Sequence, residues 1–327
     1  MEIIRSNIIH PLRAEKYFPE NRVTFIDIET TGLDRKREVI YLIGLLYFDW
    51  TRESWILNQY FASDLAKEGR LLESFIADLQ DFDLLISYNG DSFDLPFIGH
   101  RLKKYGLDDK FFQGLGSFDL YRLVRKNNIF LNLPSLKLKS LEQFLGFERE
   151  DKYSGLECIG FYYDYMENKD PILRENILKH NFDDLVNMLD TISILDVLDE
   201  KKAFSLQFEG RERKFSISAI EGSGDTFLVS GDIEPKIQNN LKYYRDSYSL
   251  VTEGQSSFSL TLYYKTGFVS ENEKGLYMDT ADFPDLSSFE NKSPYKLGKN
   301  IALLKVGKSY CFENIKSLVK EIFKSIS

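Results

Sequence analysis

Cysteine and histidine are scarce in this sequence. Its 327 residues include only two cysteines, Cys158 and Cys311, and three histidines. Two cysteines exclude a disulfide framework and a thiolate zinc site, and such low usage is typical of a reducing cytosol. Three scattered histidines exclude a histidine-rich metal cage. The sequence therefore predicts a cytoplasmic protein without structural disulfides.

Long hydrophobic runs are also missing. The longest apolar run is Val39–Phe48, well short of the roughly 20 residues that a membrane-spanning helix needs. The first 21 residues carry charged and polar side chains throughout and lack the apolar core of a signal peptide. We therefore expect a soluble protein with no membrane partner.

The sequence has no excess of positive charge. It carries 42 Lys and Arg against 51 Asp and Glu, and its net charge is −9. Residues 1–200 hold a charge of −11, whereas residues 201–327 hold +2. An acidic first part argues against a protein that binds nucleic acid by broad neutralisation of phosphates. It is compatible with an enzyme whose few phosphate contacts pass through bound metal ions.

The residue pattern changes near residue 200. Before it, runs rich in β-branched and aromatic residues alternate with helical patterns, which is typical of a sheet flanked by helices. After it, short alternating runs dominate, and one amphipathic helix over Phe312–Ile326 closes the chain. The sequence predicts an α/β domain over residues 1–199 and a small α+β domain of unknown role over 200–327. In the first domain we expect strands at 23–29, 39–48, 55–61 and 84–88, and helices at 71–79, 95–105, 136–145, 156–166 and 171–198.

Asp27 and Glu29 form the most informative pair. They stand two apart on an expected strand, so they point to the same face and lie about 6.6 Å apart at ~3.3 Å per residue. Burial and repulsion both oppose the ionisation of such a pair. No Lys or Arg in the strand offsets the charge, so a divalent cation, Mg²⁺ or Mn²⁺, is the natural partner. For this pair alone, the alternative of two acids capping a turn at a strand end is favoured.

Two further acidic segments follow along the chain. Asp94 comes after an expected strand and a polar turn, in the first turn of a helix, where the helix dipole favours a carboxylate. The alternative is that Asp91 or Asp94 caps this helix. His180 and Asp184 stand four residues apart in the long helix and share one face. Taken alone, this last pair is explained equally well by a solvated helix face.

Together the three segments resemble the DEDD superfamily of metal-dependent 3′–5′ exonucleases. Asp27 and Glu29 match its first motif, Asp94 matches the second, and Asp184 matches the third. The residues around Asp94 that also match the second motif are Asn89, Phe93 and Pro96. The resemblance is strongest to the bacterial YprB-type ribonuclease H-like proteins and covers roughly residues 20–198. In one departure, His180 stands at the spacing that the superfamily usually gives to tyrosine.

The resemblance implies a ribonuclease H-like mixed sheet flanked by helices and a two-metal hydrolysis of phosphodiester bonds. Two Mg²⁺ or Mn²⁺ ions would be bound by the four carboxylates already named, and His180 would position and deprotonate the attacking water. The implied substrate is the 3′ end of single-stranded DNA or RNA. The residues that would face its terminal nucleotide are Thr30, Thr31, Leu33 and Asn89.

Two alternatives stay open at this point. The first is a catalytically silent nucleic-acid-binding or scaffold protein on the same fold, and the second is a structure-selective endonuclease with the same metal centre. Asp119 is a reserve acid, which we interpret as structural. The sequence does not indicate protein partners, the oligomeric state or a preference between DNA and RNA.

Overall fold

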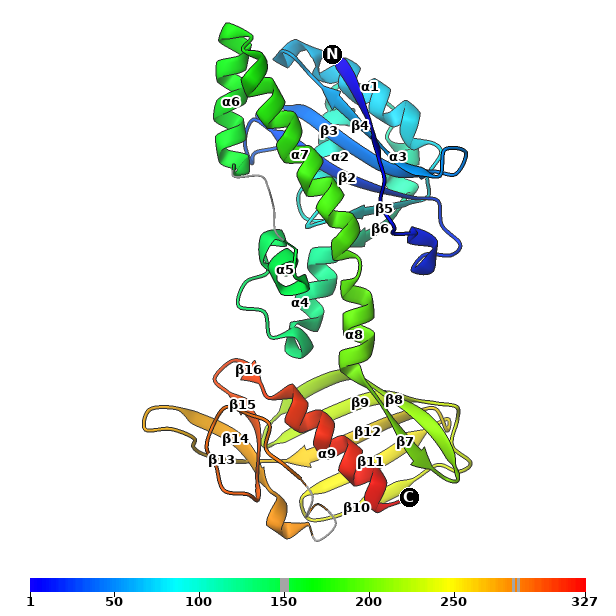
Figure 1. Cartoon of the computed structure of the whole chain (residues 1–327), viewed down its shortest axis with the longest axis vertical. Helices are drawn as coiled ribbons and strands as arrows, with labels where there is room; N and C mark the ends of the chain where they lie inside the picture. The colour runs from blue at the N-terminus through cyan, green and yellow to red at the C-terminus, as the bar shows by residue number, and fades with distance from the viewer. Residues whose placement is uncertain (148–152, 284–285, 287–288) are drawn as a thin grey trace. The chain divides into compact units, whose positions relative to one another are not determined.

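The computed structural model describes residues 1–147, 153–283, 286 and 289–327. The chain forms two compact units (Figure 1). The first contains Met1–Arg125 and Leu133–Ile194, and the second contains Lys126–Asn132 and Leu195–Ser327. The helix α4 (Leu120–Leu131) therefore begins in the first unit and ends in the second. The expected domain boundary between residues 199 and 200 stays a prediction.

The first unit is built on a six-stranded mixed sheet with the order β1-β4-β3-β2-β5-β6. The strands β1, β4, β3 and β2 pair antiparallel, and β2, β5 and β6 pair parallel. The bounds are β1 Glu2–Ile8, β2 Val23–Thr30, β3 Ile40–Asp49, β4 Ser54–Phe61, β5 Leu84–Ser87 and β6 Gly116–Asp119. The sequence did not predict β1 and β6, because both are edge strands with a largely exposed residue pattern.

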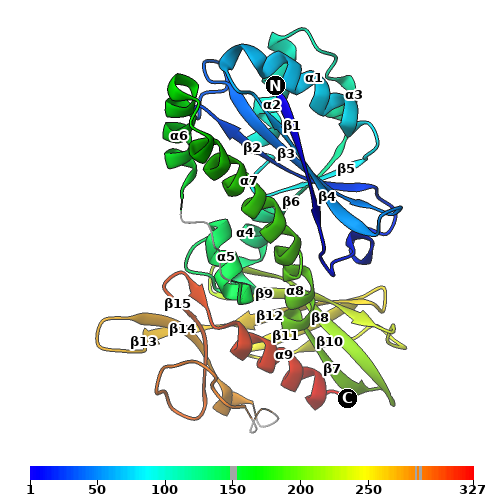
Figure 2. The same ribbon diagram turned by 45° about the horizontal axis from the view of Figure 1, so that its top comes forward.

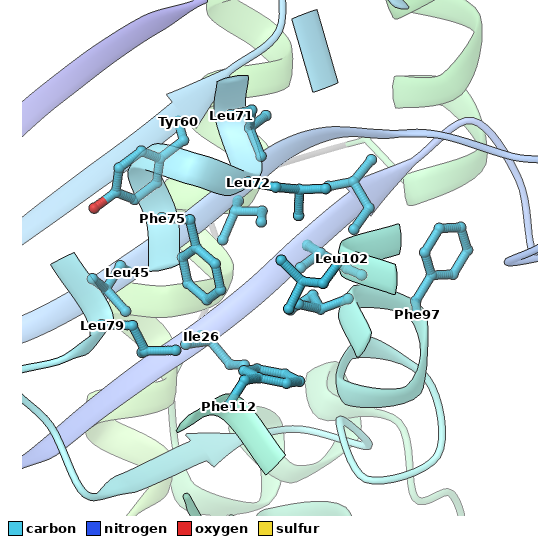
Figure 3. Packing of buried hydrophobic residues seen from close by; sticks show 14 of the residues in the cluster. Ile26, Leu45, Tyr60, Leu71, Leu72, Phe75, Leu79, Phe97, Leu102 and Phe112 are labelled. Carbon is cyan, nitrogen blue, oxygen red and sulfur yellow. The ribbon is translucent and has the colours of Figure 1, made fainter. Parts of the chain in front are cut away.

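One face of this sheet is covered by α1 (Glu68–Leu79), α2 (Asp94–Lys104) and the short α3 (Lys110–Gly114). Figure 3 shows the buried side chains that fill this layer. They include Ile26, Leu45 and Tyr60 from the sheet, Leu71, Leu72, Phe75 and Leu79 from α1, Phe97 and Leu102 from α2, and Phe112 from α3. Because alternate residues of a strand face opposite sides, the burial of Ile26 and Ile28 in this layer turns Asp27 and Glu29 toward the other face.

The other face is covered by α6 (Gly155–Asn168) and α7 (Pro171–Thr191), and α7 packs against β2 and β3 (Figure 2). Tyr162 of α6 stacks on Tyr41 of β3, with ring centroids 4.0 Å apart. Asp170 caps α7 by accepting the N–H of Ile172 at 2.9 Å, as expected from a proline in the next position. The helix α5 (Leu138–Leu145) also packs on α7. The helix expected over 171–198 is interrupted, since α7 ends at Thr191 and α8 begins at Ile194.

The second unit combines two antiparallel sheets with α8 (Ile194–Lys202) and α9 (Phe312–Ser325). Phe323 of α9 packs against Phe208, Phe215 and Phe258 of the larger sheet. The larger sheet has the order β10-β11-β12-β9-β8-β7 and the smaller one β13-β14-β15-β16. The bounds are β7 Ala203–Phe208, β8 Arg211–Ser223, β9 Thr226–Glu234, β10 Lys242–Tyr244, β11 Tyr248–Glu253, β12 Ser257–Tyr263, β13 Lys265–Phe268, β14 Lys274–Asp279, β15 Ile301–Val306 and β16 Ser309–Tyr310. The expected α/β fold with an added α+β part is confirmed. In the described residues, no helix has both the length and the apolar character needed to cross a membrane.

Candidate active site

The two acids of β2 lie beneath consecutive residues of α7. Asn181 donates a hydrogen bond from Nδ2 to Oδ2 of Asp27 at 2.8 Å. The next contact involves His180, whose Nε2 lies 3.6 Å from Oε1 of Glu29. Glu29 and His180 are both buried. The strand therefore brings Asp27 and Glu29 to the face that α7 covers.

His180 also approaches Asp184, the acid of the third motif. Its Nε2 lies 3.9 Å from Oδ2 of Asp184, one helical turn further along α7. The imidazole thus stands next to two carboxylates from different elements, Glu29 on β2 and Asp184 on α7.

Asp94 joins this group from the start of α2. Its Oδ1 accepts the backbone N–H of Ile28 at 3.1 Å. This N–H is available because β5 pairs with β2 only as far as Phe25, which leaves the later part of that strand edge open. Phe93 occupies the N-cap position of α2 without a side-chain cap. Asp94 therefore connects α2 to the strand that carries the first two acids.

The surroundings of Asp94 oppose its ionisation. Its pKa is raised from 3.8 to about 7. Desolvation by burial is the largest cause, two backbone N–H bonds act against it, and the nearby charges of Asp119 and Asp184 add to it. The charge of Asp184, from the third motif, thus acts on Asp94 from the second. A cation bound next to this buried carboxyl would offset the cost of desolvating and ionising it.

The acids do not form a finished metal site. Among the residues that the structure describes, no group of three or more His, Cys, Asp or Glu side chains is arranged to hold an ion. Asp27 faces Asn181, and Glu29 faces His180. The donor types nevertheless fit a hard divalent cation, because carboxylate oxygens are what Mg²⁺ and Mn²⁺ prefer. The raised pKa of Asp94 likewise fits a place for positive charge.

The end of β2 and the loop after it contain Thr30, Thr31 and Leu33, three of the four residues expected to face the substrate. The Thr30 hydroxyl donates to the carbonyl of Gly32 at 2.8 Å. The Thr31 hydroxyl donates to Oε2 of Glu38 at 2.6 Å and accepts the N–H of Val39 at 3.0 Å. Both threonines are buried and shape the turn. Leu33, by contrast, is 84% exposed.

Leu33 also lines a hollow of about 390 Å³. Its other lining residues are Asp34, Arg35, Lys36, Ser92, Phe93 and Phe97. Phe93 directly precedes Asp94 in the chain. It combines apolar side chains with two cationic ones.

Asn89 belongs to the turn between β5 and α2, and Asp119, the last residue of β6, accepts hydrogen bonds from this turn. Asn89 has a positive φ of 69°, and its backbone N–H donates to Oδ1 of Asp119 at 2.9 Å. The other oxygen of Asp119 accepts the N–H of Asp91 at 3.2 Å. Asp119 therefore organises this turn, in agreement with its interpretation as a structural acid.

Two residues near Asp27, Gln59 and Gly44, were not singled out from the sequence. Asn181 contacts Asp27 directly, and Gln59 donates to Asn181. Gly44 lies directly opposite Asp27 on the neighbouring strand. A lone glycine inside an apolar strand run signals the close approach of another part of the chain. The polar Gln59 in an otherwise buried strand was a second signal.

The chain was compared with known proteins. A family model described as the RNase_H superfamily matches residues 24–195, more than half of the chain. The chain belongs to the RNase_H superfamily. This membership agrees with the mixed sheet between helices, and it confirms the expected ribonuclease H-like fold.

Individual relatives of this RNase_H superfamily protein match it only in part. It is 28% identical over 189 residues to the uncharacterized protein YprB of Bacillus subtilis (strain 168), covering 57% of this chain and 44% of that one. It is 30% identical over 112 residues to a DNA polymerase of Pyrococcus glycovorans, covering 28% and 14%. Among solved structures, it resembles the family B DNA polymerase of Pyrobaculum calidifontis with 18% identity and a TM-score of 0.42, covering 55% and 25%. The chain thus spans less than half the length of these relatives. The expected kinship with YprB is confirmed.

Proposed function

We propose that this protein is a metal-dependent 3′–5′ exonuclease that hydrolyses phosphodiester bonds of single-stranded DNA or RNA. The observation that carries the proposal is the position of Asp94. Its carboxyl accepts a hydrogen bond from the backbone N–H of Ile28, which lies between Asp27 and Glu29. The charge of Asp184 also contributes to its raised pKa. Acids from three distant segments therefore gather in a fold of the RNase_H superfamily.

In this proposal the four acids, of the DEDD type, hold two Mg²⁺ or Mn²⁺ ions. The ions would stabilise the charge that develops on the oxygen of the attacking water and on the leaving oxygen of the phosphodiester. The carboxylates of Asp27, Glu29, Asp94 and Asp184 supply about four negative charges to balance them. Occupancy by cations would also favour the ionised form of Asp94, whose pKa burial otherwise raises.

His180 acts as the proton acceptor in this proposal. Its Nε2 lies within 4 Å of both Glu29 and Asp184, and the ring is buried. It would orient a water molecule toward the terminal phosphodiester and take up its proton at Nε2.

The 3′ end of the substrate is proposed to occupy the hollow that Leu33 lines. Leu33 and Phe93 offer apolar surface for the terminal base, and Arg35 and Lys36 offer positive charge for phosphates. Thr30, Thr31 and Asn89 would act mainly through the backbone turns that they build. The preference between DNA and RNA depends on contacts with the 2′-hydroxyl.

A silent scaffold on the same fold is the main competing function. The raised pKa of the buried Asp94 supports the enzyme instead, because a scaffold gains nothing from grouping repelling acids. A structure-selective endonuclease would use the same acids and differs only in its products.

The test uses the full chain and its Asp94→Ala variant, with 3′- and 5′-labelled single-stranded DNA and RNA, in Mn²⁺ or EDTA. We expect the wild type to release nucleoside monophosphates from the 3′ end in Mn²⁺ only, and the variant to release none. Asp183→Asn is the matched control, because Asp183 adjoins Asp184 in the chain but pairs with Lys179 at 3.0 Å. An inactive wild type, an active Asp94→Ala, or internal cuts would each refute the proposal.

A further inference from the structure

Three residues lie directly opposite one another on adjacent strands next to the proposed site. Asp27 on β2 pairs with Gly44 on β3, and Gly44 pairs with Gln59 on β4. Because glycine has no side chain, a gap separates the carboxylate from the amide. Two side chains of α7 occupy it. A Cβ at Gly44 would lie 2.5 Å from Oδ1 of Asn181 and 2.2 Å from Cδ1 of Leu185.

In the hydrogen bonds across this gap, Gln59 donates to Asn181 and Asn181 donates to Asp27. Gln59 donates from Nε2 to the carbonyl of Leu178 at 2.8 Å and to Oδ1 of Asn181 at 2.9 Å. A carbonyl only accepts, so the nitrogen of Gln59 must face this way. Oδ1 of Asn181 then accepts, and Nδ2 is turned toward Asp27. That nitrogen donates to Oδ2 of Asp27 at 2.8 Å and to its backbone oxygen at 3.3 Å.

Burial makes this arrangement rigid. Asn181 is 0% exposed and Gln59 is 2% exposed, so water does not compete for their amides. An ionised carboxylate accepts hydrogen bonds only, and the Asn181 donor suits that form of Asp27. The carbonyl of Leu178 therefore sets the orientation of a carboxylate on another element through two amides.

We propose that Gln59 and Asn181 are positioning residues that fix the Asp27 carboxylate for cation binding. This inference rests on the proposed function, in which Asp27 is a metal ligand. The two amides contact neither substrate nor cation. They hold the Asp27 side chain in one rotamer. Hydrogen-bond partners of a metal ligand orient that ligand, and their loss weakens metal binding.

Asn58 provides a matched control for ordinary burial of an amide. It precedes Gln59 on β4, is 1% exposed and points to the opposite face of the sheet. There it accepts from Nε of Arg5 at 2.9 Å and donates to Oδ2 of Asp78 at 3.4 Å. Replacement of Asn58 by leucine thus removes two hydrogen bonds without reaching the acids of the site.

The experiment compares Asn181→Leu, Gln59→Leu and Asn58→Leu with the wild type in the full chain. Urea unfolding in EDTA reports the fold, calorimetric titration reports Mn²⁺ affinity, and a labelled single-stranded oligonucleotide gives kcat and KM. We expect Asn181→Leu to raise the Mn²⁺ dissociation constant about 10- to 100-fold, to lower kcat and to leave KM for the oligonucleotide unchanged. Gln59→Leu should act in the same direction and less strongly. Asn58→Leu should lose stability while its Mn²⁺ affinity and kcat stay at the wild-type level.

The possible outcomes separate this inference from the proposed function. A folded Asn181→Leu that binds Mn²⁺ as the wild type does, or an Asn58→Leu that weakens binding equally, overturns the positioning role. If Asn181→Leu does not fold, Gln59→Leu decides by the same criterion, because Asn181 itself is intact there. A wild type that binds Mn²⁺ without cleaving the oligonucleotide refutes the nuclease and leaves the Mn²⁺ affinities to decide the positioning role. A wild type that binds no Mn²⁺ refutes both.

Discussion

Oδ1 of Asp94 accepts the backbone N–H of Ile28 at 3.1 Å. This bond attaches the first residue of α2 to the strand residue between Asp27 and Glu29. It places a buried carboxyl where solvent is excluded and where Asp184 repels its charge.

Asp94→Asn should stabilise the metal-free protein at high pH. Burial raises the Asp94 pKa to about 7 from 3.8, so the folded state holds the proton more tightly than the unfolded state. This contribution to stability is complete below about pH 4 and is lost as pH rises through about 7. In EDTA, the free energy of unfolding of the variant relative to that of the wild type should therefore increase from about pH 5 to about pH 8. At ~1.4 kcal/mol per pKa unit, the increase should reach a few kcal/mol. Urea unfolding at both pH values measures it, and an equal difference at each pH would contradict it.

His180→Phe should remove catalysis without removing cation binding. Phenylalanine fills similar space but cannot accept a proton, so kcat should fall by about 10²- to 10⁴-fold. Mn²⁺ affinity should remain, because the four acids are intact. His180→Tyr is the informative companion, since it restores the residue usual at this spacing, and it should keep part of the activity. Oligonucleotide cleavage and Mn²⁺ titration give both values, and unchanged cleavage by His180→Phe would exclude the role.

Gly44→Ala and Gly99→Ala should change stability in opposite directions. A Cβ at Gly44 would overlap Leu185 and Asn181, and overpacking of this kind costs roughly 1–3 kcal/mol. At Gly99, inside α2, the nearest atom to such a Cβ is 3.9 Å away on Phe112, so alanine should gain roughly 0.5–1 kcal/mol of helix stability. Urea unfolding of both variants tests this. A Gly44→Ala variant as stable as the wild type would show that the packing of α7 on the sheet does not require a glycine at this position.

Leu33→Ser should weaken substrate binding without changing stability. Leu33 is 84% exposed, so the folded protein loses little packing. If it packs on the terminal base, losing partial burial of the side chain should raise KM about fivefold, roughly 1 kcal/mol. Ile9→Ser is the control, since Ile9 is 96% exposed in the same unit. Equal KM values for the two variants would argue against a substrate contact.

A fragment ending at Asp199 should be poorly soluble. Phe130 belongs to the second unit, where it is 5% exposed and packs edge-to-face on Phe312 at 4.9 Å. Asn127 of the same segment accepts a hydrogen bond from Lys202. The fragment would lose both partners and expose the phenylalanine. Phe130→Gln should improve the fragment in size-exclusion chromatography and destabilise the full chain by roughly 3 kcal/mol or more. A monodisperse unmodified fragment would instead favour the boundary expected from the sequence.

Local patterns in the sequence were enough to predict much of the first unit. Alternation along β2 placed Asp27 and Glu29 on one face, and the structure has both facing α7. Asp170 and Pro171 marked the start of α7 where it begins. The end of α7 at Thr191 was missed, because the helical pattern continues into α8. Signals of this type depend on a few neighbouring residues, so no long-range information is needed to read them.

The sequence by itself determined which residues could carry the chemistry and on which kind of element each one stands, since strand alternation and helix caps are properties of short segments. Only the tertiary structure decided which of them meet. Strand register and helix docking between segments far apart in the chain produce three features of the site. They are the hydrogen bond between Asp94 and Ile28, the gap at Gly44 and the position of Asn181 beside Asp27. Such contacts are fixed by the packing of whole layers, and no local pattern encodes that packing.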